Sequence, residues 1–311
     1  MVKTKKNAEQ IEAAPLIALR AYQQPFFWRD DLRRAGLLWR RQAGKSTTLA
    51  GIALRRMMSR PDHECIFASA SVRLGVEFVR KESRLWMKLL DWYRGAASAS
   101  GLKLESNADG LDFDAVCDLF EHQKLETKIF HGHTSYSRSV VVAANPDTAV
   151  GWTGDIFLDE FGRIPELQDV LEAVYPFIDN NPNFILRMAT TPPPDDAHYS
   201  WEMLVPPQEE FPVNREGNWY RSQAGILVHR ADVYDCYAAG LLCYDRESGD
   251  ALNPDEHRAR EFDKAAWDRN YGLRFIRGGV AALSLQSIFL AMERGKDKGM
   301  CNAVTEEIAV A

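Results

Sequence analysis

The sequence has few cysteines and no long apolar run. Its five cysteines are an odd number, are irregularly spaced and form no CxxC pair, which argues against a disulfide framework and a zinc ribbon. The longest apolar stretches, such as 140–144, are far too short to span a bilayer, and residues 1–15 are basic without an apolar centre. We therefore expect no export signal, no membrane span and a reducing compartment.

The sequence also lacks internal repeats and low-complexity tracts, so solenoid and disordered classes are not indicated. What remains is an ordinary globular composition of 311 residues, with 46% hydrophobic and 26% charged residues. A chain of this length can form one large domain or two domains of ordinary size, and either can bury a full core.

The net charge of -6 is unevenly distributed along the chain. The first 60 residues contain 13 Lys and Arg against 4 Asp and Glu, a net charge of +9, which leaves -15 for the rest. A basic segment of this kind is typical of a surface that faces a polyanion. The polyanion could be a nucleic acid or the phosphate groups of a nucleotide.

Strand-length apolar runs alternate with helical patterns through the middle of the chain. We expect strands at 37–39, 65–68, 139–144, 155–158 and 184–189, and helices at 47–58, 72–92 and 166–174. Residues 95–115 are rich in Ser, Ala, Gly and Asp and indicate an insertion or loop. Strands that are apolar on both faces and alternate with helices predict an α/β fold, with a parallel sheet covered by helices on both faces.

Both ends of the chain depart from this alternation. A helical pattern spans about 11–35 and is interrupted near Pro25. After the prolines at 192–194 the pattern indicates a strand pair at 219–222 and 225–229, and helices at 254–262 and 265–274, the first of them capped by Asn253. We therefore divide the chain into an N-terminal helical segment (1–35), a core (36–200) and a smaller C-terminal subdomain (201–311).

The most specific local motif is Gly44-Lys45-Ser46, between the strand at 37–39 and a helix. Such a loop aims backbone N–H groups at a phosphate, a Lys at the β- and γ-phosphates and a hydroxyl at Mg²⁺. The full Walker A pattern GxxxxGK[ST] is not met, because Trp39 stands where the first Gly would be. A solvated turn is the alternative interpretation.

A second motif is the pair Asp159-Glu160, which ends the strand at 155–158 as a Walker B pair would. Ligands of parallel sheets bind at this edge, so Asp159 is placed to hold Mg²⁺ and Glu160 to polarise a water molecule. Two consecutive acids favour hydrolysis over transfer to an acceptor. Solvated acids before a turn are the alternative, but the pair follows the loop by about 114 residues in the element order that a nucleotide site requires.

A third motif, Thr190-Thr191, ends the strand at 184–189 and precedes Pro192. Hydroxyl groups next to a phosphate site can bind the γ-phosphate or its attacking water and relay the loss of the phosphate to other elements. Taken alone, Thr-Thr-Pro is an ordinary turn.

Together these motifs resemble the large terminase subunit of tailed bacteriophages, the ATPase that pumps DNA into a procapsid. The matching segments are Tyr22-Gln23, the loop 41–46, the acids within 156–162, the strand end 189–192 and the segment 145–151. In that family the first Gly of the loop is commonly missing and an Arg-Gln precedes the variable residue, so Trp39 fits. The resemblance covers about 15–200 and, more faintly, 253–290, where Gly272 replaces the acid usual after Tyr271.

The resemblance implies a RecA/ASCE-like P-loop NTPase fold with a small C-terminal lid-like subdomain, and ATP and Mg²⁺ as cofactors. Tyr22 and Gln23 would contact adenine, although an ordinary helix face would also explain them. The phosphates would be bound by Gln42, Ala43, Gly44, Lys45, Ser46 and Thr47, and the magnesium ion by Ser46 and Asp159. The catalytic roles would fall to Glu160, Lys45 and Arg41, with Arg40 as an alternative to Arg41. Thr190 or Thr191 would couple hydrolysis to motion.

The resemblance further implies a motor subunit that couples ATP hydrolysis to translocation of viral double-stranded DNA into a procapsid. Its partners would be double-stranded DNA, the portal protein, the small terminase subunit and further copies of the chain in a ring. It would act in the cytoplasm of the infected bacterial host or of a prophage carrier, away from membranes and outside the mature virion.

We expect no nuclease activity on this chain, because its acids after residue 200 lie in polar or helical context. Two other functions remain open. One is another nucleic-acid-dependent P-loop ATPase such as a helicase, although too few residues follow Pro192 for a second RecA-like lobe. The other is a non-catalytic packaging or assembly adaptor, against which the intact Lys45, Ser46, Asp159 and Glu160 argue.

Overall fold

The computed structural model describes most of the chain between residues 18 and 276. The described residues are 18–69, 80–82, 84–85, 88, 120–122, 126–131, 134–144, 146, 151, 153–194, 196–207, 216–276, 292 and 294–295. The expected loop at 95–115 and most of the expected helix at 72–92 lie outside them, as do most of 145–151 and all of 1–17. No helix in these ranges is long and apolar enough to cross a membrane.

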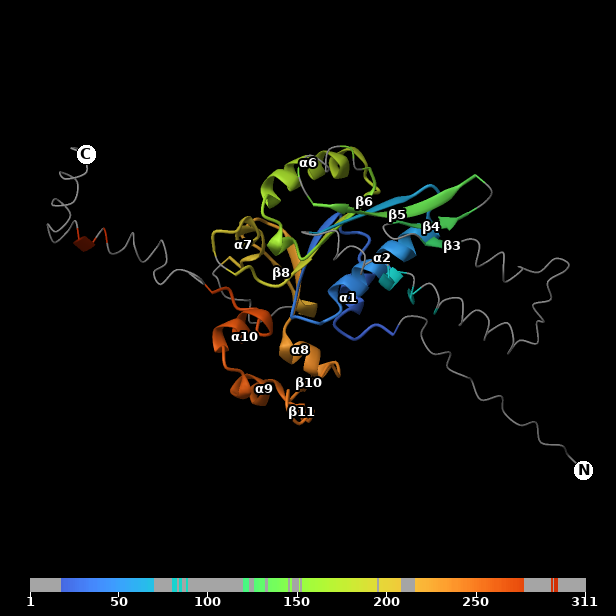
Figure 1. The fold of residues 1–311 in the computed structure, drawn as a ribbon. Coiled ribbons are helices and arrows are strands. Elements are labelled where there is room, and N and C mark those ends of the chain that lie inside the picture. The colour runs from blue at the N-terminus through green and yellow to red at the C-terminus, as the bar shows by residue number, and fades with distance from the viewer. Residues whose placement is uncertain are drawn as a thin grey trace, which may run out of the picture.

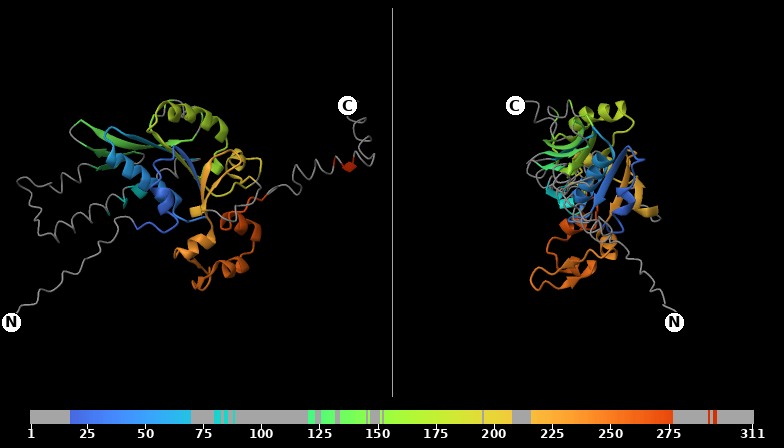
Figure 2. Two further views of the ribbon diagram at one scale, coloured as in Figure 1. Left: turned by 180° about the vertical axis from the view of Figure 1, so that it is seen from behind. Right: turned by 90° about the vertical axis from the view of Figure 1, so that its right-hand side faces the viewer.

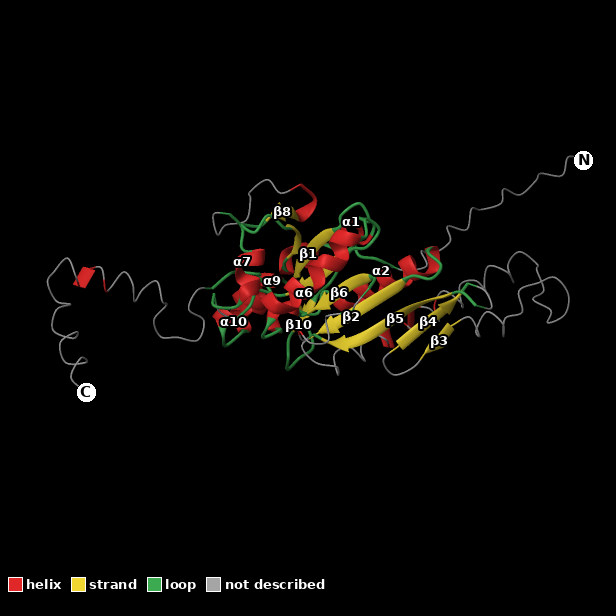
Figure 3. Ribbon diagram, turned by 90° about the horizontal axis from the view of Figure 1, so that it is seen from above, coloured by secondary structure: helices red, strands yellow, loops and turns green. Residues whose placement is uncertain are grey.

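A nine-stranded sheet forms the centre of the described structure, with the order β3-β4-β5-β2-β6-β7-β1-β9-β8 (Figure 1). The strands are β1 Arg34–Trp39, β2 Glu64–Ser69, β3 Phe120–His122, β4 Glu126–Phe130, β5 Tyr136–Ala143, β6 Asp155–Asp159, β7 Leu186–Thr190, β8 Trp219–Arg221 and β9 Leu227–Ala231. All five strands expected within the core are present. The six strands from β5 to β9 in this order are parallel, and both edges are antiparallel. Figure 3 shows β2, β5, β4 and β3 side by side at one edge.

Helices cover both faces of the sheet, as expected. Helices α1 (Gln24–Phe27) and α2 (Lys45–Ser59) pack on one face, and α6 (Leu167–Asn180) and α7 (Tyr199–Leu204) belong to the other (Figures 1 and 2). The alternation of side chains along each strand divides the core accordingly. In β1, Leu37 and Trp39 join the first cluster and Leu38 the second.

The core extends beyond residue 200, which corrects the expected boundary. The strands expected at 219–222 and 225–229 were assigned to the C-terminal subdomain, but β9 pairs in parallel with β1 and belongs to the central sheet. Val228 and Ala231 are fully buried there, and the backbone N–H of Arg40 donates to the Ala231 carbonyl. The pairing of β9 with β1 and the burial of β9 in the sheet depend on residues far away in the sequence, and a local sequence pattern does not reveal them.

A smaller unit follows the last strand of the sheet, drawn in orange to red below it in Figure 1. It contains α8 (Val233–Ala238), β10 (Cys243–Tyr244), β11 (Ala251–Leu252), α9 (Pro254–Arg260) and α10 (Lys264–Asn270). Asn253 caps α9 as predicted, and Glu256 completes a capping box. The two-stranded sheet β10-β11 was not predicted, because two residues carry too short a pattern.

The expected long helix before residue 35 is wrong within the part that is described. Only α1 is helical between residues 18 and 33, and β1 already begins at Arg34. Pro25 occupies the first turn of α1, where its missing N–H costs no hydrogen bond. The apolar spacing that suggested a longer helix instead supplies Tyr22, Phe26 and Phe27 to the core.

Candidate nucleotide-binding site

The loop between β1 and α2 is shaped by two residues in the left-handed region. Gln42 has a φ of 59° and Gly44 a φ of 81°. A Cβ on Gly44 would lie 2.9 Å from Nε2 of Gln23, so glycine is favoured both by its backbone and by its close approach. No side chain caps the first turn of the 15-residue helix α2. Its backbone N–H groups and helix dipole are therefore directed at the space above the loop, as anion binding requires.

Lys45 is held against the loop and the acid motif. Its Nζ lies 3.4 Å from the carbonyl oxygens of Trp39 and Arg40 and 3.3 Å from Oε1 of Glu160. The side chain is only 5% exposed, whereas that of Glu160 is 27% exposed. Two residues 115 positions apart in the sequence thus form one ion pair at the C-terminal edge of the sheet.

Ser46 and Asp159 meet beside this pair. The Ser46 hydroxyl donates a hydrogen bond to Oδ2 of Asp159 at 2.5 Å. Burial raises the pKa of Asp159, the charge of Glu160 raises it further, and the bond from Ser46 offsets part of the effect. A divalent cation would relieve the repulsion between the two carboxylates, and a hydroxyl with a carboxylate is the hard oxygen donor set that Mg²⁺ prefers. These residues therefore fit the expected magnesium ion.

Glu160 adopts a conformation that is uncommon for a residue with a side chain. Its φ is 50° and its ψ is 41°, and its N–H donates to Oδ1 of Asp159 at 3.1 Å. Non-glycine residues in the left-handed region are rare and concentrate at functional sites. The turn directs the Glu160 carboxylate toward Lys45.

Tyr22 and Gln23 lie beneath the loop. The Tyr22 hydroxyl donates to the carbonyl of Ala43 at 2.8 Å, and its ring packs edge-on against Trp39. The Gln23 amide donates to Oγ1 of Thr48 at 3.1 Å. Both side chains are buried and support the loop, and the adenine contact that the resemblance implies for them stays a prediction.

The two arginines of the loop point to different surroundings. Arg40 is buried, donates to the carbonyl of Leu241 at 3.2 Å and lies over the ring of Tyr271. It ties the loop to the small C-terminal unit, so this geometry does not favour it as the alternative to Arg41. Arg41 is exposed, and its backbone N–H donates to the carbonyl of Asn270 at 2.9 Å.

Thr190 joins the end of β7 to the segment that follows the two acids. Its Oγ1 donates to the carbonyl of Thr191 at 2.9 Å and accepts from the N–H of Gly162 at 3.3 Å. A Cβ on Gly162 would lie 2.7 Å from that oxygen, so the two segments are in close contact. Thr190 and Thr191 are both buried at this edge of the sheet.

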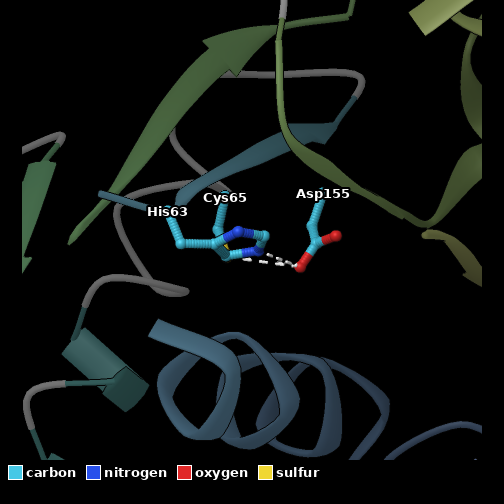
Figure 4. Close-up of side chains that lie close together, drawn as sticks. All are labelled: His63, Cys65 and Asp155. Carbon is cyan, nitrogen blue, oxygen red and sulfur yellow. Dashed lines mark hydrogen bonds and ion pairs between the residues drawn. The ribbon is translucent and has the colours of Figure 1, made fainter. Parts of the chain in front are cut away.

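The structure also brings together a cluster that the sequence did not indicate, formed by His63, Cys65 and Asp155 (Figure 4). It lies at the opposite end of β6 from Asp159. Nε2 of His63 is hydrogen-bonded to Oδ2 of Asp155 at 2.5 Å, and Arg56 donates to both oxygens of the same carboxylate. Burial and the Asp155 charge raise the pKa of the Cys65 thiol well above its usual range.

This cluster serves the core rather than a metal ion. A cation would have to displace the buried guanidinium of Arg56 from Asp155, and the protonated Cys65 is a poor ligand. The backbone N–H of Ile185 also donates to Asp155, so the carboxylate of β6 is linked to α2, to the residue before β2 and to the segment before β7. The signals in the sequence were an Arg on the apolar face of a helix and an acid at the start of a buried strand.

A loop between β1 and α2, with two acids at the end of β6, a parallel strand separated from β1 by β7, is the arrangement of an α/β P-loop fold. No family model matches the chain, and no curated protein matches it in sequence. Solved structures do match. The large terminase ATPase domain of Thermus phage P74-26, in a point-mutant form, has a TM-score of 0.54 and 16% identity, over 82% of this chain and 93% of that chain.

Two larger proteins have the same fold in part. The bacteriophage HK97 large terminase has a TM-score of 0.52 and 16% identity, over 83% of this chain and 50% of that chain. The large terminase of a thermophilic bacteriophage in complex with ADP has a TM-score of 0.51 and 11% identity, over 83% and 54%. This chain thus spans about half the length of those two proteins and has the fold of a phage large terminase ATPase domain.

Proposed function

We propose that this chain is the ATPase of a viral DNA-packaging motor, which hydrolyses ATP to translocate double-stranded DNA into a procapsid. The observation that carries the proposal is the pairing of Lys45 with Glu160 and of Ser46 with Asp159 at one sheet edge. Fold-level likeness to terminase ATPase domains, one of them in a protein solved with ADP, supports both the nucleotide and the process.

Hydrolysis would proceed by in-line attack of water on the γ-phosphate. When the triphosphate draws Lys45 toward its oxygens, Glu160 loses its ion-pair partner and its carboxylate becomes free to orient and polarise the attacking water. Lys45 and Arg41 would neutralise the charge that develops on the phosphoryl oxygens. Mg²⁺, held by Ser46 and Asp159, would supply further charge stabilisation when bound.

Coupling to motion would begin at Thr190. Its hydroxyl bridges Gly162, two residues after Glu160, and Thr191, the residue after β7. A change at Glu160 would therefore reach the prolines at 192–194 within a few residues. In the cytoplasm of an infected host, the partners would be DNA, the portal protein, the small terminase subunit and further copies of this chain in a ring.

The proposal is tested by phosphate release from the purified chain with ATP and Mg²⁺, with and without double-stranded DNA. We expect steady turnover, stimulation by DNA, and a loss of about a hundredfold or more in Lys45→Ala with an unchanged circular dichroism spectrum. Arg221→Ala, an exposed arginine on edge strand β8, is the matched control and should keep the parent rate.

Turnover of Lys45→Ala at the parent rate would show that the loop is not the nucleotide site. ATP binding without turnover in the parent protein would favour the non-catalytic adaptor. Hydrolysis stimulated by single-stranded but not by double-stranded DNA would favour the helicase-like alternative.

A further inference from the structure

A cavity of about 510 Å³ lies next to the candidate nucleotide site. Its walls come from the segment after the two acids, the end of β7 with its prolines, the start of α7 and the end of α10. The lining residues are Arg41, Gly162, Arg163, Pro165, Thr190–Pro194, His198, Arg269 and Asn270. None of Gly44, Lys45, Ser46, Asp159 and Glu160 lines it, and it adjoins the loop through Arg41.

Three arginines line this cavity without a partner of their own. Within the described ranges, the guanidinium groups of Arg41, Arg163 and Arg269 make no hydrogen bond and no ion pair, and no carboxylate lines the cavity. Other arginines near α10 are neutralised. Arg258 pairs with Asp268 at 2.7 Å, and Arg246 pairs with Glu261. An unneutralised trio around one hollow produces a strongly positive potential there.

We propose that this cavity binds inorganic phosphate, the product of the hydrolysis proposed above, after the phosphate leaves the catalytic loop and before it reaches solvent. The inference rests on that proposed function. Planar guanidinium groups bind phosphate oxygens through paired N–H donors, and Arg41 lies at the start of the loop that would hold the γ-phosphate. The N–H of Arg163 donates to the carbonyl of Glu160, so this arginine ends the turn that begins at the proposed catalytic acid.

The arrangement favours a free phosphate ion over the backbone of DNA. A duplex presents phosphates in series and is bound by cations spread along a surface. Here three arginines line a single hollow, and the proposed coupling residues Thr190 and Thr191 line it as well.

Phosphate in this cavity would connect the catalytic core to the small C-terminal unit. Arg163 belongs to the core, whereas Arg269 lies on α10 of that unit. The two parts are already joined by the hydrogen bond from the Arg41 N–H to the Asn270 carbonyl. A bound phosphate would add a charged bridge between them, and its departure would release that bridge.

The test is direct binding of inorganic phosphate to the purified full chain without nucleotide, measured by isothermal titration calorimetry. Binding should weaken by about tenfold or more in each of Arg163→Gln and Arg269→Gln, since each loses a charge-assisted pair of hydrogen bonds. The charge-preserving Arg269→Lys should recover part of the affinity. Arg221→Gln is the control, and thermal unfolding without phosphate confirms that each variant folds.

Three outcomes separate this inference from the function on which it rests. Phosphate binding that survives Lys45→Ala and disappears in the Arg163 and Arg269 variants supports the cavity, even if turnover is absent. Binding that depends only on Lys45 overturns the cavity and leaves the ATPase proposal intact. A short DNA duplex that competes with phosphate, and whose own affinity falls equally in both arginine variants, also overturns it, because the cavity would then bind the DNA backbone.

Discussion

Asp155 and Asp159 occupy the first and last positions of β6 and have opposite pKa shifts. Burial disfavours the charged form of both. In Asp155 the hydrogen bonds from His63 and Arg56 outweigh burial and lower the pKa, whereas in Asp159 the neighbouring Glu160 reinforces burial and the pKa rises. One strand thus carries at one end a carboxylate whose charged form is stabilised by its neighbours, and at the other end a carboxylate whose charged form is destabilised by burial and by Glu160.

The same substitution at these two positions should have opposite consequences. Asp155→Asn leaves the buried Arg56 without its partner and should lower the free energy of unfolding by about 3–5 kcal/mol. Asp159→Asn removes a buried like charge beside Glu160 and should leave stability unchanged or slightly increased. Denaturant unfolding at pH 7 measures the free energy of unfolding of both variants. Equal destabilisation of the two would contradict the inference that Asp155 stabilises the fold and Asp159 does not.

Glu160→Gln should separate nucleotide binding from turnover. The amide keeps the size of the side chain but cannot polarise water, so ATP affinity should persist while phosphate release falls by about a hundredfold or more. Asp159→Asn is the companion variant and should instead weaken binding that depends on Mg²⁺. Loss of binding in Glu160→Gln, with turnover per bound nucleotide preserved, would reverse the two roles.

Glu82 should make the folded protein less stable as the pH rises. Burial raises its pKa to about 8, and the hydrogen bond from Ser139 offsets only part of this shift. The folded state therefore retains a proton that the unfolded chain loses near pH 4.3, so the contribution of Glu82 is complete below about pH 4 and is lost as pH rises toward 8. Across that window stability should fall by up to about 1.4 kcal/mol per pH unit.

The profile of Glu82→Gln tests this expectation, because its side chain stays neutral throughout. Urea unfolding at several pH values should give a flatter curve for Glu82→Gln than for the parent protein. Glu172→Gln replaces an exposed acid on α6 and should leave the parent profile unchanged. A parent profile that is already flat between pH 4 and 8 would show that Glu82 ionises normally.

Plasmid DNA incubated with the purified chain and Mn²⁺ should remain intact. Two-metal cleavage needs carboxylates that converge on ions about 4 Å apart, whereas four acids of the small C-terminal unit already bind other groups of the chain. Asp232 and Asp263 cap helices, Asp245 pairs with Arg260, and Asp255 accepts from Tyr234. Linearisation that survives Lys45→Ala but disappears in Asp245→Asn/Asp250→Asn would overturn this prediction.

The sequence by itself determined the alternation of strands and helices, the position of the loop at 44–46 before a helix and the position of the acids at 159–160 at a strand end. These features are local, because a strand, a turn and a helix start each leave a pattern within a few residues. The resemblance to terminases followed from the same motifs, and the described fold is that of their ATPase domain.

Only the tertiary structure decided which distant residues meet. Strand β9 lies beside β1, Arg40 donates to the carbonyl of Leu241 in the small unit, and Arg163 and Arg269 line one cavity. Buried residues take their partners from distant parts of the sequence. Asp155, for example, is paired with Arg56, which lies on α2, 99 positions away. Charges buried by folding take their properties from spatial neighbours, and a linear pattern does not contain those neighbours.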